Sequence, residues 1–165
     1  MSNGSYFEDI KVGQVIKHWP GRTISETDNS WFSLLTQNQH PVHIDAHYAK
    51  STQHGQNLVN GLLVLAIAIG QTVNDISLRA IANLDYESVK HEGPTFHGDT
   101  IYTTSTILAL RVTSKGDRGV VYLETEVTNQ REERVMEVRR HVLIPKKNHP
   151  TLGEGKIAHD SESLT

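Results

Sequence analysis

The 165-residue sequence contains no cysteine. This absence excludes disulfide bonds, thiolate catalysis and zinc sites built on cysteine. The sequence also lacks a basic bias: the formal net charge is −3, and no basic stripe is interleaved with aromatic residues. A charged face that binds nucleic acid is therefore not expected. With 36% hydrophobic and 21% charged residues, the composition is that of an ordinary soluble protein.

Long apolar segments are missing as well. Residues 1–6 show no basic segment followed by an apolar stretch, which argues against a signal peptide. The one strongly apolar run, residues 62–69, is too short to span a bilayer. We therefore predict a cytoplasmic protein that binds neither nucleic acid nor a membrane. Residues 1–147 are predicted to form one domain. The polar remainder, residues 148–165, is expected to be a disordered tail.

The first half of the chain carries helical patterns. Ser25 is typical of a helix N-cap. Trp31, Leu34 and Leu35 follow it at helical spacing. They predict a helix over residues 26–36 with one buried face.

Two further helices are predicted. A short one is expected over residues 46–51. A longer one, over residues 61–76, begins after Asn60 and is apolar on all sides from Leu62 to Ile69. A helix that is apolar on every side has to be buried on every side. Its length of roughly 24 Å, at about 1.5 Å per residue, matches that of a strand of about seven residues.

The second half of the chain carries strand patterns, in which apolar and polar residues alternate. The strands are predicted around residues 82–87, 101–112, 121–127 and 136–144. Because they follow one another directly, we expect an antiparallel meander.

A buried helix followed by a long antiparallel sheet suggests an α+β arrangement in which the sheet wraps around the helix. This arrangement resembles the hotdog fold. One copy would leave sheet edges and one sheet face poorly protected, so a homodimer is expected.

The most informative segment runs from Asn38 to Asp45 and lies between two predicted helices. Its sequence is Asn-Gln-His-Pro-Val-His-Ile-Asp. Pro41 fixes its own φ and disfavours helix at the preceding residue, so His40 and His43 are expected on a rigid extended turn. A rigidly held histidine can act as a general base, because the unperturbed pKa of an imidazole lies near the operating pH.

Residues 36–45, followed by residues 48–49 and 59–63, resemble the hydratase signature of MaoC-like (R)-specific enoyl-CoA hydratases. The resemblance extends over residues 5–147. Members of that family carry an Asp-x-Asn-Pro-x-His core and then a glycine that opens the central helix. This sequence matches the pattern at three positions, which are Pro41, His43 and Gly61.

The sequence departs from the family pattern at three positions. Asn38 stands where the family has its catalytic aspartate, His40 replaces the asparagine before the proline, and Gln37 replaces a glycine. Residues 70–84 look like one branch of the family, the mesaconyl-CoA hydratases, also named β-methylmalyl-CoA dehydratases. In that branch a histidine before the proline is familiar.

The resemblance implies a lyase that adds water reversibly to the double bond of a 2-enoyl-CoA. The implied substrate is a short branched or dicarboxylic thioester such as mesaconyl-CoA. His43 would be the base that activates water, and the Gly61 amide would be the oxyanion donor at the N-terminus of the central helix. Asn38 would orient the water or the imidazole, with His40 or Asp45 in support. No metal or redox cofactor is implied, since CoA arrives with the substrate.

Simpler roles stay open for each of these residues. His43 could be a loop histidine bonded to backbone, and His40 could only brace the turn. Asn38 could be a helix C-cap, and Gly61 could merely start a helix. His40, His43, Asp45 and His47 could also form a metal site, because two of the histidines lie four residues apart.

Two rival functions stay open as well. One is a hotdog acyl-CoA thioesterase that uses an acidic residue as base or nucleophile. The other is a non-catalytic domain that binds acyl-CoA. A second carboxylate on the substrate would need a cation, for which the sequence offers Arg79, Lys90 and Arg140.

Overall fold

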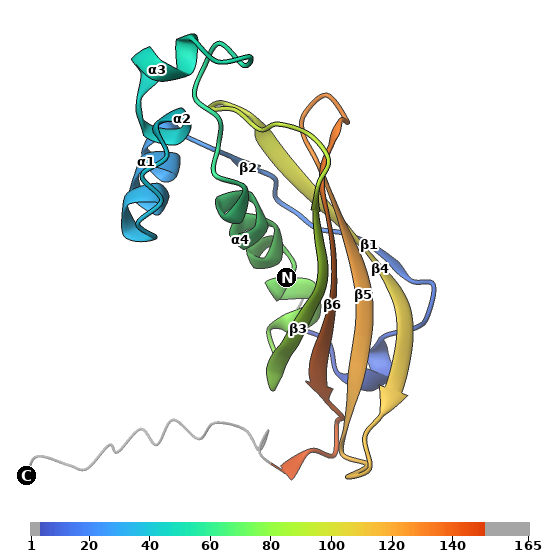
Figure 1. Ribbon diagram of the computed structural model, residues 1–165. Coiled ribbons are helices and arrows are strands. Elements are labelled where there is room, and N and C mark those ends of the chain that lie inside the picture. The colour runs from blue at the N-terminus through green and yellow to red at the C-terminus, as the bar shows by residue number, and fades with distance from the viewer. Residues whose placement is uncertain (1–3, 151–165) are drawn as a thin grey trace, which may run out of the picture.

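The computed structural model describes residues 4–150. Its main element is a curved antiparallel sheet in the strand order β1-β4-β5-β6-β3 (Figure 1). These strands are Val15–Lys17 (β1), Thr100–Val112 (β4), Arg118–Thr128 (β5), Arg134–Pro145 (β6) and Ala82–His91 (β3). A short strand, Arg22–Thr23 (β2), also pairs with β4. The sheet curves around helix α4, Gly61–Gln71, as the predicted arrangement requires.

The four long strands lie where the alternating pattern predicts them. The inward-facing residues of β5, which are Val121, Leu123, Thr125 and Val127, are completely buried. The residues between them are partly exposed. Since side chains alternate across a strand, this pattern places one face of the sheet on the core.

The predicted meander is correct for β4, β5 and β6 and wrong for β3. Instead of lying next to β4, β3 pairs with β6 at the opposite edge of the sheet. The connection over residues 92–99 makes this possible. Its eight residues can span up to roughly 26 Å, whereas crossing β6 and β5 requires three strand spacings, about 14 Å.

Helix α1, Glu26–Leu35, confirms the predicted helix, and its N-cap is Ser25 as expected. Ser25 and Asp28 form a reciprocal capping box, in which each side chain accepts a hydrogen bond from the backbone N–H of the other residue. The short helix predicted over residues 46–51 is α3, Ala46–Lys50. A single additional turn, α2, spans Pro41–Ile44.

The predicted buried face of α1 is wrong. Trp31, Leu34 and Leu35 are 73%, 61% and 80% exposed in the single chain, whereas Asn29 and Ser33 are fully buried. The helix turns its polar side inward because Asn29 makes hydrogen bonds there to backbone groups of other segments. Helical periodicity identified the helix but not the side that faces the core.

The predicted central helix consists of α4 and a π-helical segment, Val73–Ser77. It is not buried on every side: Leu63, Val64 and Ala68 are buried, but Leu62 is 57% exposed. The reason is that the sheet of one chain covers only one side of the helix (Figure 1).

Two remaining expectations concern the chain's ends and its apolar segments. Of the predicted tail over residues 148–165, only 148–150 belong to the described residues, and the rest lies outside them. Within residues 4–150, none of the helices combines the length and the apolar character needed to cross a membrane.

Candidate active site

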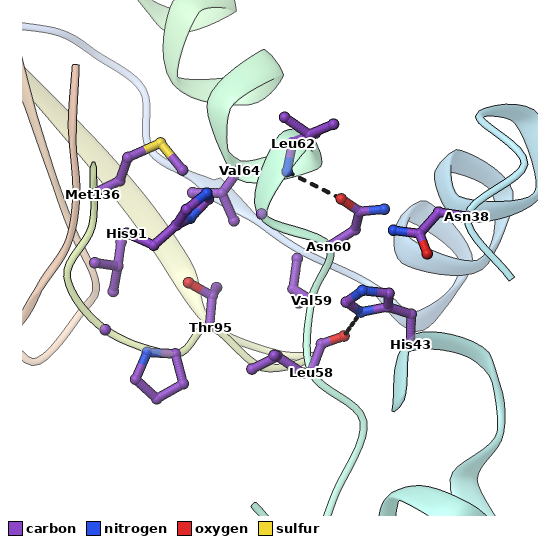
Figure 2. Close-up of a pocket in the computed structure, with 14 residues that line it drawn as sticks. Asn38, His43, Leu58, Val59, Asn60, Leu62, Val64, His91, Thr95 and Met136 are labelled. Atoms are coloured by element: carbon purple, nitrogen blue, oxygen red, sulfur yellow. Dashed lines mark hydrogen bonds between the residues drawn. The ribbon is translucent and has the colours of Figure 1, made fainter. Parts of the chain in front are cut away.

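A pocket of about 380 Å³ lies at the N-terminal end of α4. Its walls come from α2 and the segments before α2 and after α3, from the first turn of α4, from the end of β3 and the β3–β4 connection, and from the start of β6. Three of the predicted site residues, Asn38, His43 and Gly61, line this pocket together (Figure 2). Two others, His40 and Asp45, do not line it.

A hydrogen bond to backbone selects the ring tautomer of His43 that a general base requires. Its Nδ1 lies 2.8 Å from the carbonyl oxygen of Leu58 (Figure 2). A carbonyl can only accept, so Nδ1 carries the hydrogen and Nε2 of the neutral ring keeps its lone pair. The predicted extended turn is only partly correct. The backbone of His40 is extended as predicted, but that of His43 is helical because Pro41 occupies the first position of α2.

A buried asparagine that the sequence did not indicate holds this arrangement together. The side-chain nitrogen of Asn29 lies 3.1 Å from the carbonyl oxygens of both His43 and Leu58 and 2.9 Å from Nε2 of His97. Its side-chain oxygen accepts a 2.8 Å hydrogen bond from the backbone N–H of Asn60. Asn29 therefore links α1, α2, the β3–β4 connection and the start of α4.

The N-terminus of α4 presents one unpaired backbone donor. The side-chain oxygen of Asn60 caps the helix by accepting a hydrogen bond from the N–H of Leu62. The backbone carbonyl of Asn60 accepts from the N–H groups of Leu63 and Val64. Within the described part of the chain, the N–H of Gly61 has no hydrogen-bond acceptor. An unpaired N–H at a helix N-terminus favours a ligand with negative charge.

Asn38 faces the pocket with its amide group. The end of α1 is a Schellman motif, in which the N–H of Asn38 donates to the carbonyl of Ser33. The left-handed residue of this motif is Gln37, with φ of 59°, so Asn38 is not the left-handed C-cap that its residue type suggested. The side-chain oxygen of Asn38 accepts from the N–H of His40, which leaves its NH₂ group available as a donor.

His40 and Asp45 both act as helix caps. The His40 ring accepts at Nδ1 from the N–H of Val42 and so caps α2. Asp45 accepts from the N–H of Tyr48 and caps α3. The ring centres of His40 and His43 lie 6.1 Å apart. His40 and Asp45 therefore lie beside the pocket and shape the turn that carries His43.

His91 lines the pocket and was not predicted. It is the last residue of β3, and its ring lies close to Gly61. Figure 2 shows His91 beside the start of α4. A β-carbon placed on Gly61 would lie 2.3 Å from Cε1 of His91, a distance so short that the ring would have to move. No local pattern predicts this contact, because it depends on the pairing of β3 with β6.

The turn before β4 is held by a buried carboxylate. Asp99 accepts hydrogen bonds from the side chains of Gln130 and Arg131 and from the N–H of Phe96. Burial favours the neutral form of Asp99, but these three hydrogen bonds outweigh it and hold the pKa of Asp99 below its usual value. The ionised carboxylate thereby fixes the connection that forms one wall of the pocket.

The three cations suggested by the sequence do not line the pocket. Lys90 pairs with Glu137, and Arg140 is buried against Asn83 and Thr72. Arg79 donates to the hydroxyl of Tyr6. Among the residues that the structure describes, no group of three or more possible metal ligands is gathered, and this includes the histidines around α2.

In sequence, the chain is similar to two proteins that are named as a dehydratase and a hydratase of CoA thioesters. β-Methylmalyl-CoA dehydratase of Chloroflexus aurantiacus is 37% identical over 145 residues, which cover 88% of this chain and 41% of that protein. Mesaconyl-CoA hydratase of Cereibacter sphaeroides is 33% identical over 145 residues, which cover 88% and 42%. The chain thus spans about two fifths of the length of these relatives.

A solved structure confirms the predicted fold. A protein of Mycobacterium tuberculosis with a double hotdog fold superposes with a TM-score of 0.82 at 24% identity, and the match covers 99% of this chain and 52% of that one. The present chain therefore has the α+β hotdog fold. The family model described as MaoC like domain matches residues 8–136. Because this match extends over most of the sequence, the chain belongs to the MaoC-like domain family.

Proposed function

We propose that this protein is an enoyl-CoA hydratase that adds water reversibly across the double bond of a 2-enoyl-CoA. One observation carries the proposal: an imidazole with a free Nε2, on His43, and an unpaired backbone N–H, on Gly61, line the same pocket. The first group is suited to remove a proton from water, and the second to bind a thioester oxygen as it becomes negative.

In the hydration direction, Nε2 of His43 takes a proton from water as the water oxygen attacks the β-carbon. Negative charge then moves to the thioester oxygen, where the N–H of Gly61 donates a hydrogen bond. One such donor contributes about 3 kcal/mol to stabilising a transition state. Asn38 offers its NH₂ group to the water oxygen and so fixes the direction of attack. His40 and Asp45 act by holding the turn in place.

The proposed substrate is a short branched or dicarboxylic thioester such as mesaconyl-CoA. Support comes from the two relatives named above, a β-methylmalyl-CoA dehydratase and a mesaconyl-CoA hydratase. No metal or redox cofactor takes part in this mechanism, and CoA enters only as part of the substrate.

We further propose that the protein works in the cytoplasm as a homodimer. Leu62 of α4 and Leu84 and Tyr86 of the edge strand β3 are exposed large apolar residues. An open strand edge beside exposed apolar side chains favours pairing with a second chain. The length of the relatives supports the same arrangement, because each could hold two such units where this chain holds one.

The test is the loss of enoyl-thioester absorbance with crotonyl-CoA, mesaconyl-CoA and itaconyl-CoA. We expect turnover by the wild type and a loss of several orders of magnitude in His43→Ala. The matched control is His47→Ala, because His47 is exposed on α3 and does not line the pocket. Near-normal turnover in His43→Ala would remove His43 as the base.

Other outcomes would favour the rival functions. Release of free thiol from a saturated acyl-CoA, without hydration of any enoyl-CoA, would indicate a thioesterase. Binding of CoA esters without any turnover would indicate a binding domain.

A further inference from the structure

Hydration of an enoyl-CoA requires two proton transfers, one from water and one to the α-carbon. In a family whose signature contains an aspartate, a carboxyl group is available in addition to the histidine. Here that position is Asn38, which cannot exchange a proton at neutral pH. Within the described residues, the pocket lining contains two titratable side chains, His43 and His91, and no carboxylate.

Of the three consecutive residues Lys90, His91 and Glu92, only His91 turns its side chain toward the pocket. Neighbouring residues of a strand point to opposite faces. Lys90 and Glu92 accordingly form ion pairs on the other face of the sheet, Lys90 with Glu137 at 2.8 Å and Glu92 with Arg134 at 3.1 Å. The elements packed around the His91 ring offer it uncharged groups, since Gly61 begins α4 and Met136 lies opposite on β6.

The positions of the two histidines suit each of them to a different one of the two proton transfers. His43 and His91 lie on opposite sides of the segment that carries Asn60 (Figure 2). His91 is in contact with Gly61, the residue whose N–H would bind the thioester oxygen. The α-carbon of the substrate is bonded directly to the thioester carbonyl carbon. A group beside the Gly61 amide is therefore closer to the α-carbon than to the more remote β-carbon.

We propose that His91 is the general acid that protonates the α-carbon during hydration, an inference that rests on the proposed function. As an oxygen–carbon bond forms at the β-carbon, an O–H bond of water breaks and its proton passes to Nε2 of His43. The π electrons of the double bond take a proton from the imidazolium of His91, which forms the new C–H bond. No oxidant or further reactant is needed.

Each turnover leaves His43 protonated and His91 neutral. His91 is an exposed residue, so it regains its proton from solvent, and His43 releases its own in the same way. In the dehydration direction the roles reverse, with His91 removing the α-proton and His43 protonating the departing hydroxyl group.

The rival role for His91 is recognition of a second carboxylate on a dicarboxylic substrate. The two roles differ in what they predict for a substrate that lacks this carboxylate. An acid acts on crotonyl-CoA and mesaconyl-CoA alike, whereas a recognition residue matters only for mesaconyl-CoA.

The test compares His91→Gln with the wild type on both thioesters between pH 6 and 9, with His47→Gln as the matched control. General acid catalysis contributes about 10²- to 10⁴-fold. We expect kcat to fall by that factor on both substrates while KM changes little. The alkaline decline of kcat, which reports loss of the acid's proton, should disappear in His91→Gln and persist in the control.

Unchanged kcat in a folded His91→Gln protein would overturn the proposal. A loss confined to mesaconyl-CoA and expressed in KM would overturn it as well and would assign His91 to substrate recognition. These results remain distinct from failure of the proposed function, in which the wild type itself would hydrate none of the thioesters.

Discussion

The ring of His91 lies over the α-carbon of Gly61 so closely that any β-carbon at position 61 would overlap it, at 2.3 Å from Cε1 and 2.8 Å from Nδ1. Glycine at this helix start therefore allows the His91 ring to approach this closely. Its conformational freedom is not the reason, because Gly61 is not among the glycines with positive φ. Gly61 and His91 both line the pocket.

This contact predicts the behaviour of Gly61→Ala. The substitution keeps the backbone N–H but pushes the His91 ring aside. A misplacement of about 1 Å can cost roughly 100-fold in rate, so we expect a loss of about that size in kcat. In a His91→Ala background the new methyl group meets no ring, and the same substitution should cost little more. The measurement is a double-mutant cycle on kcat with crotonyl-CoA. Fully additive losses would contradict this coupling.

A second prediction concerns Asn38, whose NH₂ group is directed to the pocket while its oxygen is held by the N–H of His40. Asn38→Asp would preserve the bond to His40 but replace the donor by an acceptor. One hydrogen bond is worth about 1 kcal/mol, so turnover of mesaconyl-CoA should fall about fivefold to tenfold. Asn38→Ala is the control and should show a similar loss. If Asn38→Asp were instead faster than the wild type, a carboxylate would be the better group at this position.

Much of the fold could be predicted because its signals are local. Alternation in β5 requires only that every second residue face the core, and Ser25 marks the start of α1 by its own hydrogen bond. The position of β3 could not be predicted, because strand pairing depends on residues far apart in the sequence. The exposed side of α1 was mistaken for the same reason: a pattern shows that Trp31 and Leu34 share a face but not what covers it.

The site was predictable to a similar extent. Asn38, His43 and Gly61 come from segments whose residue types carry chemical meaning, and they do line one pocket. Asn29 and His91 could not be found in this way. A helical asparagine and a histidine at a strand end have many ordinary roles, and only the packing of α1 and the register of β3 against β6 bring them to the site.

Gln37 leads to a prediction about stability. Its φ of 59° is left-handed, a conformation that costs a residue with a β-carbon about 1 kcal/mol or more. Gln37→Gly should therefore raise the free energy of unfolding by about 1 kcal/mol, measured by urea denaturation. Gln39→Gly is the control: Gln39 has no positive φ, so the added freedom of the unfolded chain should make that variant less stable. Equal effects of the two substitutions would contradict this account.

The last prediction rests on a histidine far from the pocket. His18 is buried, with Nδ1 2.7 Å from a carboxylate oxygen of Asp75 and Nε2 2.9 Å from the hydroxyl of Ser105. Burial disfavours the imidazolium, outweighs the attraction of Asp75 and lowers the pKa of His18 below its ordinary value. The folded protein therefore binds fewer protons at this site than the unfolded chain once the pH is below the unfolded pKa.

Because the pKa of His18 is lowered in the folded state, the pH range over which this histidine changes the stability can be stated. Well above the ordinary imidazole pKa of about 6.5, His18 is neutral in both states and adds no pH dependence. As the pH falls from there toward the lower folded pKa, the free energy of unfolding should decrease by up to about 1.4 kcal/mol per unit. Carboxylates with a lowered pKa, such as Asp99, lose their contribution only in more acidic solution, below their unfolded pKa near 4. Urea denaturation at pH 7.5, 6.5 and 5.5 measures the slope. His18→Gln cannot take up this proton, so it should be less stable at pH 7.5 yet lose less stability on acidification. Equal slopes for the two proteins would show that another group controls the acid response.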